Sequence, residues 1–164
     1  MEKILISACF LGERVRYDGR DAAIGDGTIA RWKAEGRLVP ICPEVAGGLP
    51  IPRPAAELRG GDGRGVWAGG AKVVTIAGAD VTEAFRSGAR AALELAVRHE
   101  VRVAVLKQRS PSCGSSTIYD GSFEGKRIPG VGVTAALLAA EGVRVFSEDE
   151  LAEADRWLRA LEAR

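Results

Sequence analysis

Residues Arg102–Gly114 read RVAVLKQRSPSCG, an unbroken run of mainly apolar residues followed by a polar loop that carries a cysteine. A run without alternation of polar and apolar residues is typical of a strand buried on both faces of a parallel sheet. Four more runs of this kind predict the other strands: Lys3–Ala8, Leu38–Cys42, Lys72–Ala77 and Val143–Phe146. The sequence therefore predicts a mostly parallel sheet.

Helical patterns lie between and after these runs. Asp80 and Ser147 are each followed three residues later by a glutamate, which is typical of a helix N-cap with its capping partner. They predict one helix over Val81–Arg98 and another at the end of the chain, and Val133–Gly142 predicts a third that ends at a glycine. This alternation predicts an α/β, Rossmann-like fold with helices on both faces of the sheet.

Length and composition narrow the class of protein. A chain of 164 residues, 46% of them hydrophobic, suits one domain over residues 1–164. Its 23 basic and 22 acidic residues nearly cancel, so no overall field would hold DNA. No apolar run approaches the length of a membrane span, and the N-terminal residues lack a signal-peptide pattern. We expect a cytoplasmic protein without a membrane partner, in which Gly47–Gly70 forms an ordered excursion over one end of the sheet.

Three cysteines stand at corresponding places on this frame. Cys9 and Cys42 follow the first two predicted strands, and Cys113 lies in the loop after Arg102–Lys107. The carboxyl ends of parallel strands meet at one edge of the sheet, so we expect the three thiols at one crevice. An odd number of cysteines in a reducing compartment disfavours a disulfide framework. The alternative is that some of them, Cys9 in particular, only pack in the core.

The residues that could serve as ligands limit which metal centre the chain could hold. The single histidine, His99, lies at the end of a predicted helix, where a role as a helix C-terminal cation is expected rather than ligation. A closed structural zinc site needs four protein ligands. Three thiolates suit a four-iron four-sulfur cluster that leaves one iron open, and an open iron is a Lewis acid for a soft atom such as sulfur.

Four blocks of the sequence carry a resemblance to a known family. They are ISACFLGERVRYDG at Ile6–Gly19, CPEVAGGLPIPRP at Cys42–Pro54, the long block from Leu106 to Leu138 that contains SPSCG at Ser110–Gly114, and VFSE at Val145–Glu148. In this order they resemble the thiouracil desulfidase family over nearly the whole chain. Phe10 and Ala46 depart from the usual residues of the family without removing a chemical group.

The resemblance implies a cytoplasmic hydrolase that removes sulfur from thiolated uracils and gives the oxo-pyrimidine and hydrogen sulfide. It implies a [4Fe-4S] cluster held by Cys9, Cys42 and Cys113 with one open iron, and it implies that Glu44 and Ser110 act on the substrate. The implied partner is a small thiolated pyrimidine or its nucleotide, with thiolated transfer RNA less favoured.

The chemistry of the residues agrees with this implication and leaves alternatives open. Hydrolysis of a thiocarbonyl needs the sulfur polarised, a water activated and a proton supplied. Glu44 is otherwise a surface carboxylate or an N-cap partner, and Ser110 is otherwise a turn residue whose hydroxyl bonds local backbone. Three rival functions remain: a non-catalytic iron–sulfur or zinc protein, a thiol redox enzyme that uses Cys9 or Cys113, and a metal-free nucleotide-binding module.

Weaker signals surround these motifs. The sequence YDG occurs twice, at Tyr17–Gly19 and Tyr119–Gly121. The favoured interpretation is that each is a turn. The alternative is that the tyrosines, with Asp18 and Asp120, could close over a base. Arg53 between two prolines suits a carboxylate partner or a substrate phosphate. Ser112, like Ser110, flanks Pro111 and is expected to help form the turn.

Overall fold

The computed structural model describes residues 1–164 and contains a four-stranded parallel sheet in the order β2-β1-β5-β8. Its strands are β1 (Ile4–Ser7), β2 (Leu38–Ile41), β5 (Val103–Leu106) and β8 (Arg144–Ser147). Ile4 pairs with Leu38 on one side and with Val103 on the other, and Val103 pairs with Arg144. Every residue of β1 and β5 is buried, as the continuous apolar pattern predicts.

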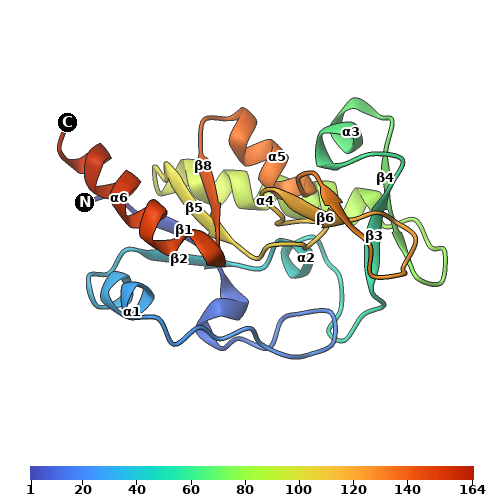
Figure 1. Cartoon of the computed structure of the whole chain (residues 1–164), viewed down its shortest axis with the longest axis horizontal. Helices are drawn as coiled ribbons and strands as arrows, with labels where there is room; N and C mark the ends of the chain where they lie inside the picture. The colour runs from blue at the N-terminus through green and yellow to red at the C-terminus, as the bar shows by residue number, and fades with distance from the viewer.

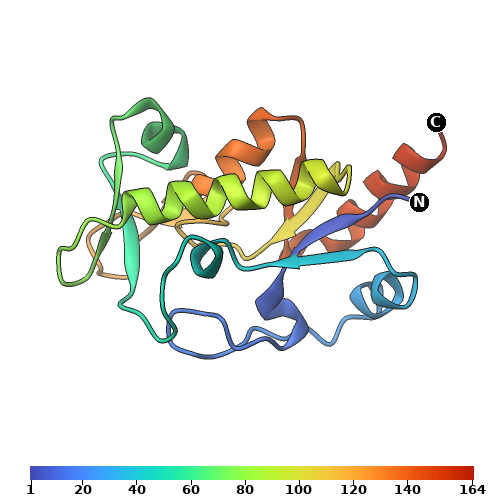
Figure 2. The same cartoon turned by 180° about the vertical axis from the view of Figure 1, so that it is seen from behind.

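Helices cover both faces of this sheet, which confirms the predicted α/β class (Figure 1). On one face lie α1 (Gly27–Ala34) and α6 (Leu151–Glu162). One apolar cluster joins them to alternate strand residues: Ile4, Ile6, Val103, Val105, Ile29, Trp32, Leu151 and Leu158. On the other face lie α4 (Thr82–Arg98) and α5 (Val133–Ala140) (Figure 2). A second cluster joins these to the intervening residues: Leu5, Ala104, Leu106, Ala92, Ala96 and Leu138.

Lys72–Ala77 contains a strand, as predicted, but this strand does not belong to the parallel sheet. It is β4 (Lys72–Thr75), which pairs antiparallel with β3 (Ala56–Arg59), with Ala56 opposite Thr75, in a separate two-stranded sheet. Val73 is buried in a third apolar cluster that includes Phe85 of α4 and Val66 of α3 (Gly63–Ala68). A strand can thus be buried on both faces by helices and loops without belonging to the central parallel sheet.

The remaining elements lie beyond the carboxyl ends of the central strands. They are the 3₁₀ helix η1 (Ala8–Leu11), the short helix α2 (Pro43–Ala46) and the hairpin of β6 (Thr117–Tyr119) and β7 (Arg127–Pro129). The excursion Gly47–Gly70 is ordered and contains β3 and α3. Trp67 of α3 donates a hydrogen bond of 2.9 Å to the carbonyl of Val133 at the start of α5.

Of the two predicted helix caps with a glutamate partner, the one at Ser147 is confirmed. Ser147 and Glu150 form a reciprocal capping box at the 3₁₀ helix η2 (Glu148–Glu150), which leads into α6. Asp80 accepts a hydrogen bond from the amide of Thr82 at 2.9 Å, but the glutamate after it, Glu83, pairs with Arg86 of the same helix instead of closing a box. None of the helices is long and apolar enough to cross a membrane.

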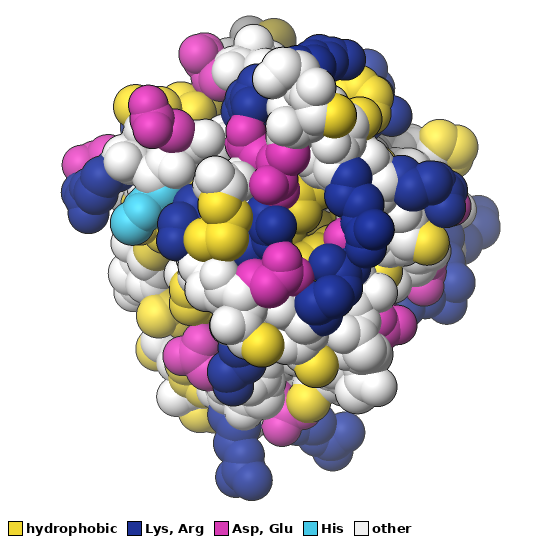
Figure 3. Space-filling view, turned by 90° about the vertical axis from the view of Figure 1, so that its left-hand side faces the viewer, with side chains coloured by type: hydrophobic (Ala, Val, Ile, Leu, Met, Phe, Trp, Pro, Cys, Tyr) yellow, Lys and Arg dark blue, Asp and Glu magenta, His cyan; other side chains and the backbone are white.

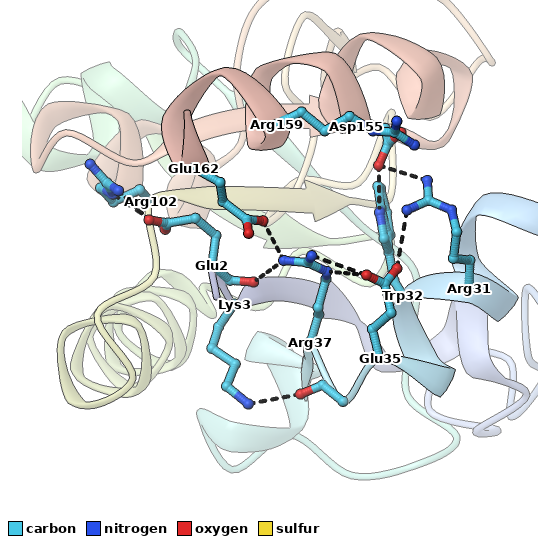
Figure 4. A network of polar contacts seen from close by, with 11 residues as sticks. Glu2, Lys3, Arg31, Trp32, Glu35, Arg37, Arg102, Asp155, Arg159 and Glu162 are labelled. Carbon is cyan, nitrogen blue, oxygen red and sulfur yellow. Dashed lines mark hydrogen bonds and ion pairs between the residues drawn. The ribbon is translucent and has the colours of Figure 1, made fainter. Parts of the chain in front are cut away.

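A network of charged side chains ties both chain termini to the amino ends of the strands (Figure 4). Arg37 contacts Glu35 at 3.0 Å and Glu162 of α6 at 2.5 Å. Basic and acidic side chains are interspersed over this end of the molecule (Figure 3). Such mixed charge fits the nearly zero net charge of the chain.

Asp155 of α6 is the acceptor that joins α6 to α1 in this network. It accepts hydrogen bonds from the Trp32 indole at 2.9 Å and from Arg31 at 2.8 Å (Figure 4). Burial raises the pKa of Asp155, but these hydrogen bonds outweigh it, so that the pKa lies below its ordinary value. The ionised form of Asp155 therefore favours the folded state.

Candidate functional site

A cavity of about 560 Å³ lies where the carboxyl ends of the parallel strands meet β3 and the β6–β7 hairpin. Its lining includes all five residues that the sequence singled out for ligation or chemistry: Cys9, Cys42, Cys113, Glu44 and Ser110. The expected convergence of the three cysteines at one crevice is therefore what the structure has. The histidine, His99, follows α4 and does not line the cavity.

Each cysteine is held by the element that follows a central strand. Cys9 belongs to η1, directly after β1, and is buried with only 6% exposed. Cys42 follows β2 and is the N-cap residue of α2. Cys113 is 5% exposed and lies in the turn after β5.

Helix α2, which carries Glu44, is seated directly on the backbone of α4. A Cβ atom built on Gly88 of α4 would lie 1.9 Å from the carbonyl oxygen of Pro43, so only glycine permits this approach. The same close contact is repeated from the other side, where a Cβ on Gly47 would lie 2.1 Å from the carbonyl oxygen of Ala84. This packing fixes Cys42 and Glu44 at the edge of the cavity.

Ser110 organises the turn of Cys113. Its Oγ accepts hydrogen bonds from the amides of Ser112 and Cys113, each at 3.1 Å. Ser110 therefore helps to form the turn, as the alternative predicted, because its hydroxyl oxygen accepts two backbone hydrogen bonds. Its hydroxyl hydrogen is still able to donate into the cavity. Ser112 is a packing residue: it is 1% exposed, and its Oγ shares a hydrogen bond of 2.7 Å with Thr134.

Gln108 organises the segment that directly follows this turn, a role that no motif in the sequence predicted. Its Oε1 accepts from the amides of Ser115, Ser116 and Thr117 at 2.9, 3.1 and 3.1 Å. Its Nε2 donates to the hydroxyls of Ser115 and Ser116 at 3.1 and 3.0 Å. No motif signals this role, because the partners are backbone amides seven to nine residues farther along the chain.

The protein raises the pKa of all three thiols. Burial, with a smaller contribution from Cys42, raises the pKa of Cys9 to about 11. Burial also raises the pKa of Cys42, although the amides of Val45 and Glu44 at the start of α2 oppose it. The pKa of Cys113 is raised by burial and then by Glu44 and the other two cysteines. These mutual effects place the three thiols within electrostatic reach of one another.

The arrangement suits a multi-metal cluster better than a single ion. No three His, Cys, Asp or Glu side chains are close enough together to hold one metal ion, so the thiols border the cavity without meeting at a point. In a four-iron cluster each cysteine ligates a different iron, so three thiols that line one cavity fit such a cluster. A closed structural zinc site needs a fourth protein ligand, which the three cysteines do not supply.

Glu44 and Arg53 form an ion pair in the wall of the cavity. Arg53 Nε lies 3.5 Å from Glu44 Oε1, and the side chain of Arg53 is only 3% exposed. Burial raises the pKa of Glu44, and Arg53 opposes part of that effect. Of the two partners expected for Arg53, the structure supplies the carboxylate.

The YDG repeats are turns, as their first interpretation predicts. Asp18 accepts from the amide of Arg20 at 3.0 Å, and Asp120 accepts from the amide of Ser122 at 2.9 Å. Neither aspartate lines the cavity, whereas Tyr17 and Tyr119 do.

Cations surround the cavity to an extent that the sequence did not indicate. Lys107 lines it and pairs with Glu148 at 2.8 Å. Three arginines that also line it have no carboxylate partner: Arg16, Arg109 and Arg127. Arg109 has a left-handed backbone with φ of 69°, which is uncommon for a residue other than glycine and is often found at functional sites.

The fold and the site together define a parallel α/β protein with a three-cysteine site at its strand ends. Comparison with known proteins supports this class. The model of the family described as 2-thiouracil desulfurase matches residues 4–150. The uncharacterized protein YbbK of Bacillus subtilis (strain 168) is 47% identical over 148 residues, which cover 90% of this chain and 97% of that protein.

A solved structure is similar over nearly its whole length. It is the [4Fe-4S]-dependent thiouracil desulfidase TudS, with 49% sequence identity, a TM-score of 0.90, and coverage of 98% of this chain and 99% of that one. The chain belongs to the 2-thiouracil desulfurase family.

Proposed function

We propose that this chain is a [4Fe-4S]-dependent desulfidase that hydrolyses the thiocarbonyl of a thiolated uracil to the carbonyl and releases hydrogen sulfide. The observation that carries the proposal is the convergence of three separated thiols with Glu44 and Ser110 on one cavity. Family membership and the similarity to TudS support it. We assign the activity to one domain over residues 1–164 and, because its three cysteines are unpaired, to the reducing cytoplasm.

Cys9, Cys42 and Cys113 would hold the cluster. Three protein ligands leave one iron of a four-iron cluster without a protein ligand, and such an iron supplies Lewis acidity toward a soft sulfur atom. The thiols lose their protons when they ligate metal. No electron transfer is needed, because water replaces sulfur at carbon without a change in oxidation state.

Glu44 is the proposed acid–base residue. Burial raises the pKa of its carboxyl, as is common for groups that transfer protons in catalysis, and the carboxyl lies in the cavity wall beside the cysteines. It would take the proton of the attacking water. Ser110, whose acceptor sites are used by two backbone amides, would donate its hydroxyl hydrogen to the substrate.

The cavity suits a thiolated pyrimidine nucleotide as well as the free base. Tyr17 and Tyr119 offer aromatic surface to a base. Arg16, Arg109 and Arg127 offer guanidinium groups that no carboxylate occupies, and guanidinium groups recognise phosphate well. We therefore propose a small thiolated pyrimidine or its monophosphate as substrate, and not DNA.

The test is sulfide release under anaerobic conditions. Protein reconstituted with iron and sulfide should release sulfide from 2-thiouracil or 4-thiouridine monophosphate and bind close to four irons per chain, the stoichiometry of one such cluster. The cluster-free protein is the control. Full activity of that control would favour the thiol redox alternative, which the raised pKa of Cys9 and Cys113 already disfavours because thiols are poor nucleophiles.

A further inference from the structure

Arg53 joins three segments of the cavity wall through one buried guanidinium. It donates to the carbonyl of Val15 at 2.9 Å and to the carbonyl of Pro50 at 3.1 Å. Its third nitrogen, Nε, faces Glu44 at 3.5 Å. Nε is the only buried side-chain nitrogen or oxygen in the structure that has no hydrogen-bond partner.

An unpartnered buried donor is costly, so its direction is informative. The two terminal nitrogens of Arg53 donate to carbonyls that fix the plane of the guanidinium, and the carboxylate that contacts Nε is that of Glu44, at 3.5 Å and without hydrogen-bond geometry. A small movement of the carboxylate would turn the 3.5 Å contact into a charge-assisted hydrogen bond. Glu44 is therefore held from one fixed direction.

The carbonyl of Val15, which accepts from Arg53, also contacts a cysteine. The contact is made by the thiol of Cys42, with 3.7 Å between oxygen and sulfur. When Cys42 loses its proton to become a ligand, it can no longer donate to that carbonyl, and Arg53 remains as its side-chain donor. The position of the guanidinium therefore does not depend on the proton of Cys42.

We infer that Arg53 is a positioning residue that holds the carboxylate of Glu44 where it can take a proton from the attacking water. The inference rests on the proposed function, because it gives Arg53 a role only if Glu44 acts on the substrate. Charge alone would not suffice. A lysine at this position could neutralise Glu44, but its single ammonium cannot hold the carbonyls of Val15 and Pro50 in a plane and face Glu44 as well.

The test is a double-mutant cycle of Arg53→Lys and Glu44→Gln in anaerobically reconstituted protein. Arg53→Lys should lower kcat roughly 10- to 100-fold, the scale of a misplaced catalytic group, with KM and iron content close to those of the wild type. In the Glu44→Gln background the same change should lower kcat by no more than about two-fold, because the group that Arg53 positions is gone.

Two further variants and a second readout keep the test independent of folding defects. Arg86→Lys is the matched control: Arg86 donates to the carbonyl of Val66 at 2.9 Å, away from the cavity, and its loss should leave kcat unchanged. Glu44→Asp withdraws the carboxylate from Nε without touching the other contacts of Arg53, and should lower kcat as Arg53→Lys does. A crystal structure of metal-free Arg53→Lys should show the Glu44 carboxylate turned from its place.

The outcomes separate the two ideas. Equal losses from Arg53→Lys in both backgrounds, a loss of iron in that variant, or an unmoved Glu44 carboxylate would overturn the positioning role and leave the desulfidase proposal standing. Absence of sulfide release from iron-loaded wild type would overturn the desulfidase proposal, and the role of Arg53 with it.

Discussion

Replacement of Gln108 by leucine tests how the turn of Cys113 is held. The side chain of Gln108 is 9% exposed, and its Oε1 accepts from three consecutive backbone amides at 2.9 to 3.1 Å. Leucine fills a similar volume but neither accepts nor donates a hydrogen bond. Each neutral hydrogen bond contributes about 1 kcal/mol, so the three amide bonds alone should lower the free energy of unfolding by about 3 kcal/mol, and loss of the two bonds that Nε2 donates to Ser115 and Ser116 should add to this.

The segment that loses these bonds, residues 115–117, begins two residues beyond Cys113 in the same loop between β5 and β6. A loosened turn leaves one of three ligands poorly placed, so Gln108→Leu should bind clearly less iron than the wild type after reconstitution. The assays are urea unfolding of the reduced metal-free protein and iron determination. Gln108→Glu is the matched variant, because a carboxylate oxygen can accept from the same amides although it cannot donate as Nε2 does, and it should retain more stability than Gln108→Leu.

A loss below about 1 kcal/mol in Gln108→Leu, which is less than a single neutral hydrogen bond contributes on average, together with full iron content, would refute this reasoning. It would mean that water replaces the amide of Gln108 at no cost, or that Ser110 alone holds the turn through the amides of Ser112 and Cys113.

Three other predictions concern the cavity and the charged network. Glu44→Gln should keep the iron and lower turnover of a thiolated uracil on the order of 100-fold, the usual effect of losing a general acid–base; near-normal turnover would remove Glu44 from the chemistry. Serine in place of Cys9, Cys42 or Cys113 should abolish the iron–sulfur absorption, and a full iron content in any of these variants would exclude the three-thiolate site. Because the folded state lowers the pKa of Asp155, its stabilising contribution is complete above the unfolded carboxyl pKa of about 4 and is lost as the pH falls through the folded value; acid unfolding of Asp155→Asn should lack this part of the pH dependence.

The sequence predicted those parts of the fold that local patterns encode. The continuous apolar runs identify all four strands of the central sheet, and the capping box at Ser147 is present. The run Lys72–Ala77 misleads because its burial comes from α3 and α4, and apolar continuity does not say what covers a strand. The strand β3 has the sequence AELR, and β7 is exposed throughout, so neither has an apolar pattern to detect.

The candidate site, too, has residues whose meeting could be predicted from the sequence and residues whose meeting could not. Cys9, Cys42 and Cys113 could be brought together from sequence because topology alone places strand ends side by side. The pairing of Arg53 with Glu44 could be expected only as one of two partners, and the three unpaired arginines of the cavity could not be expected at all. These depend on where loops between elements come to lie, and that is set by contacts between distant residues.

The charges around the cysteines explain why the protein alone does not keep them as thiolates. Lys107 and Arg16 lower the pKa of Cys9, yet burial and Cys42 raise it more, to about 11. Three negative charges in one buried cavity would repel one another and lack water, and the nearby cations offset only part of that cost. Positive metal in the cavity would offset the rest, and proton release would accompany its binding. The three thiols thus have raised pKa values in the protein alone and ionise when they ligate metal, which suits a resident cofactor.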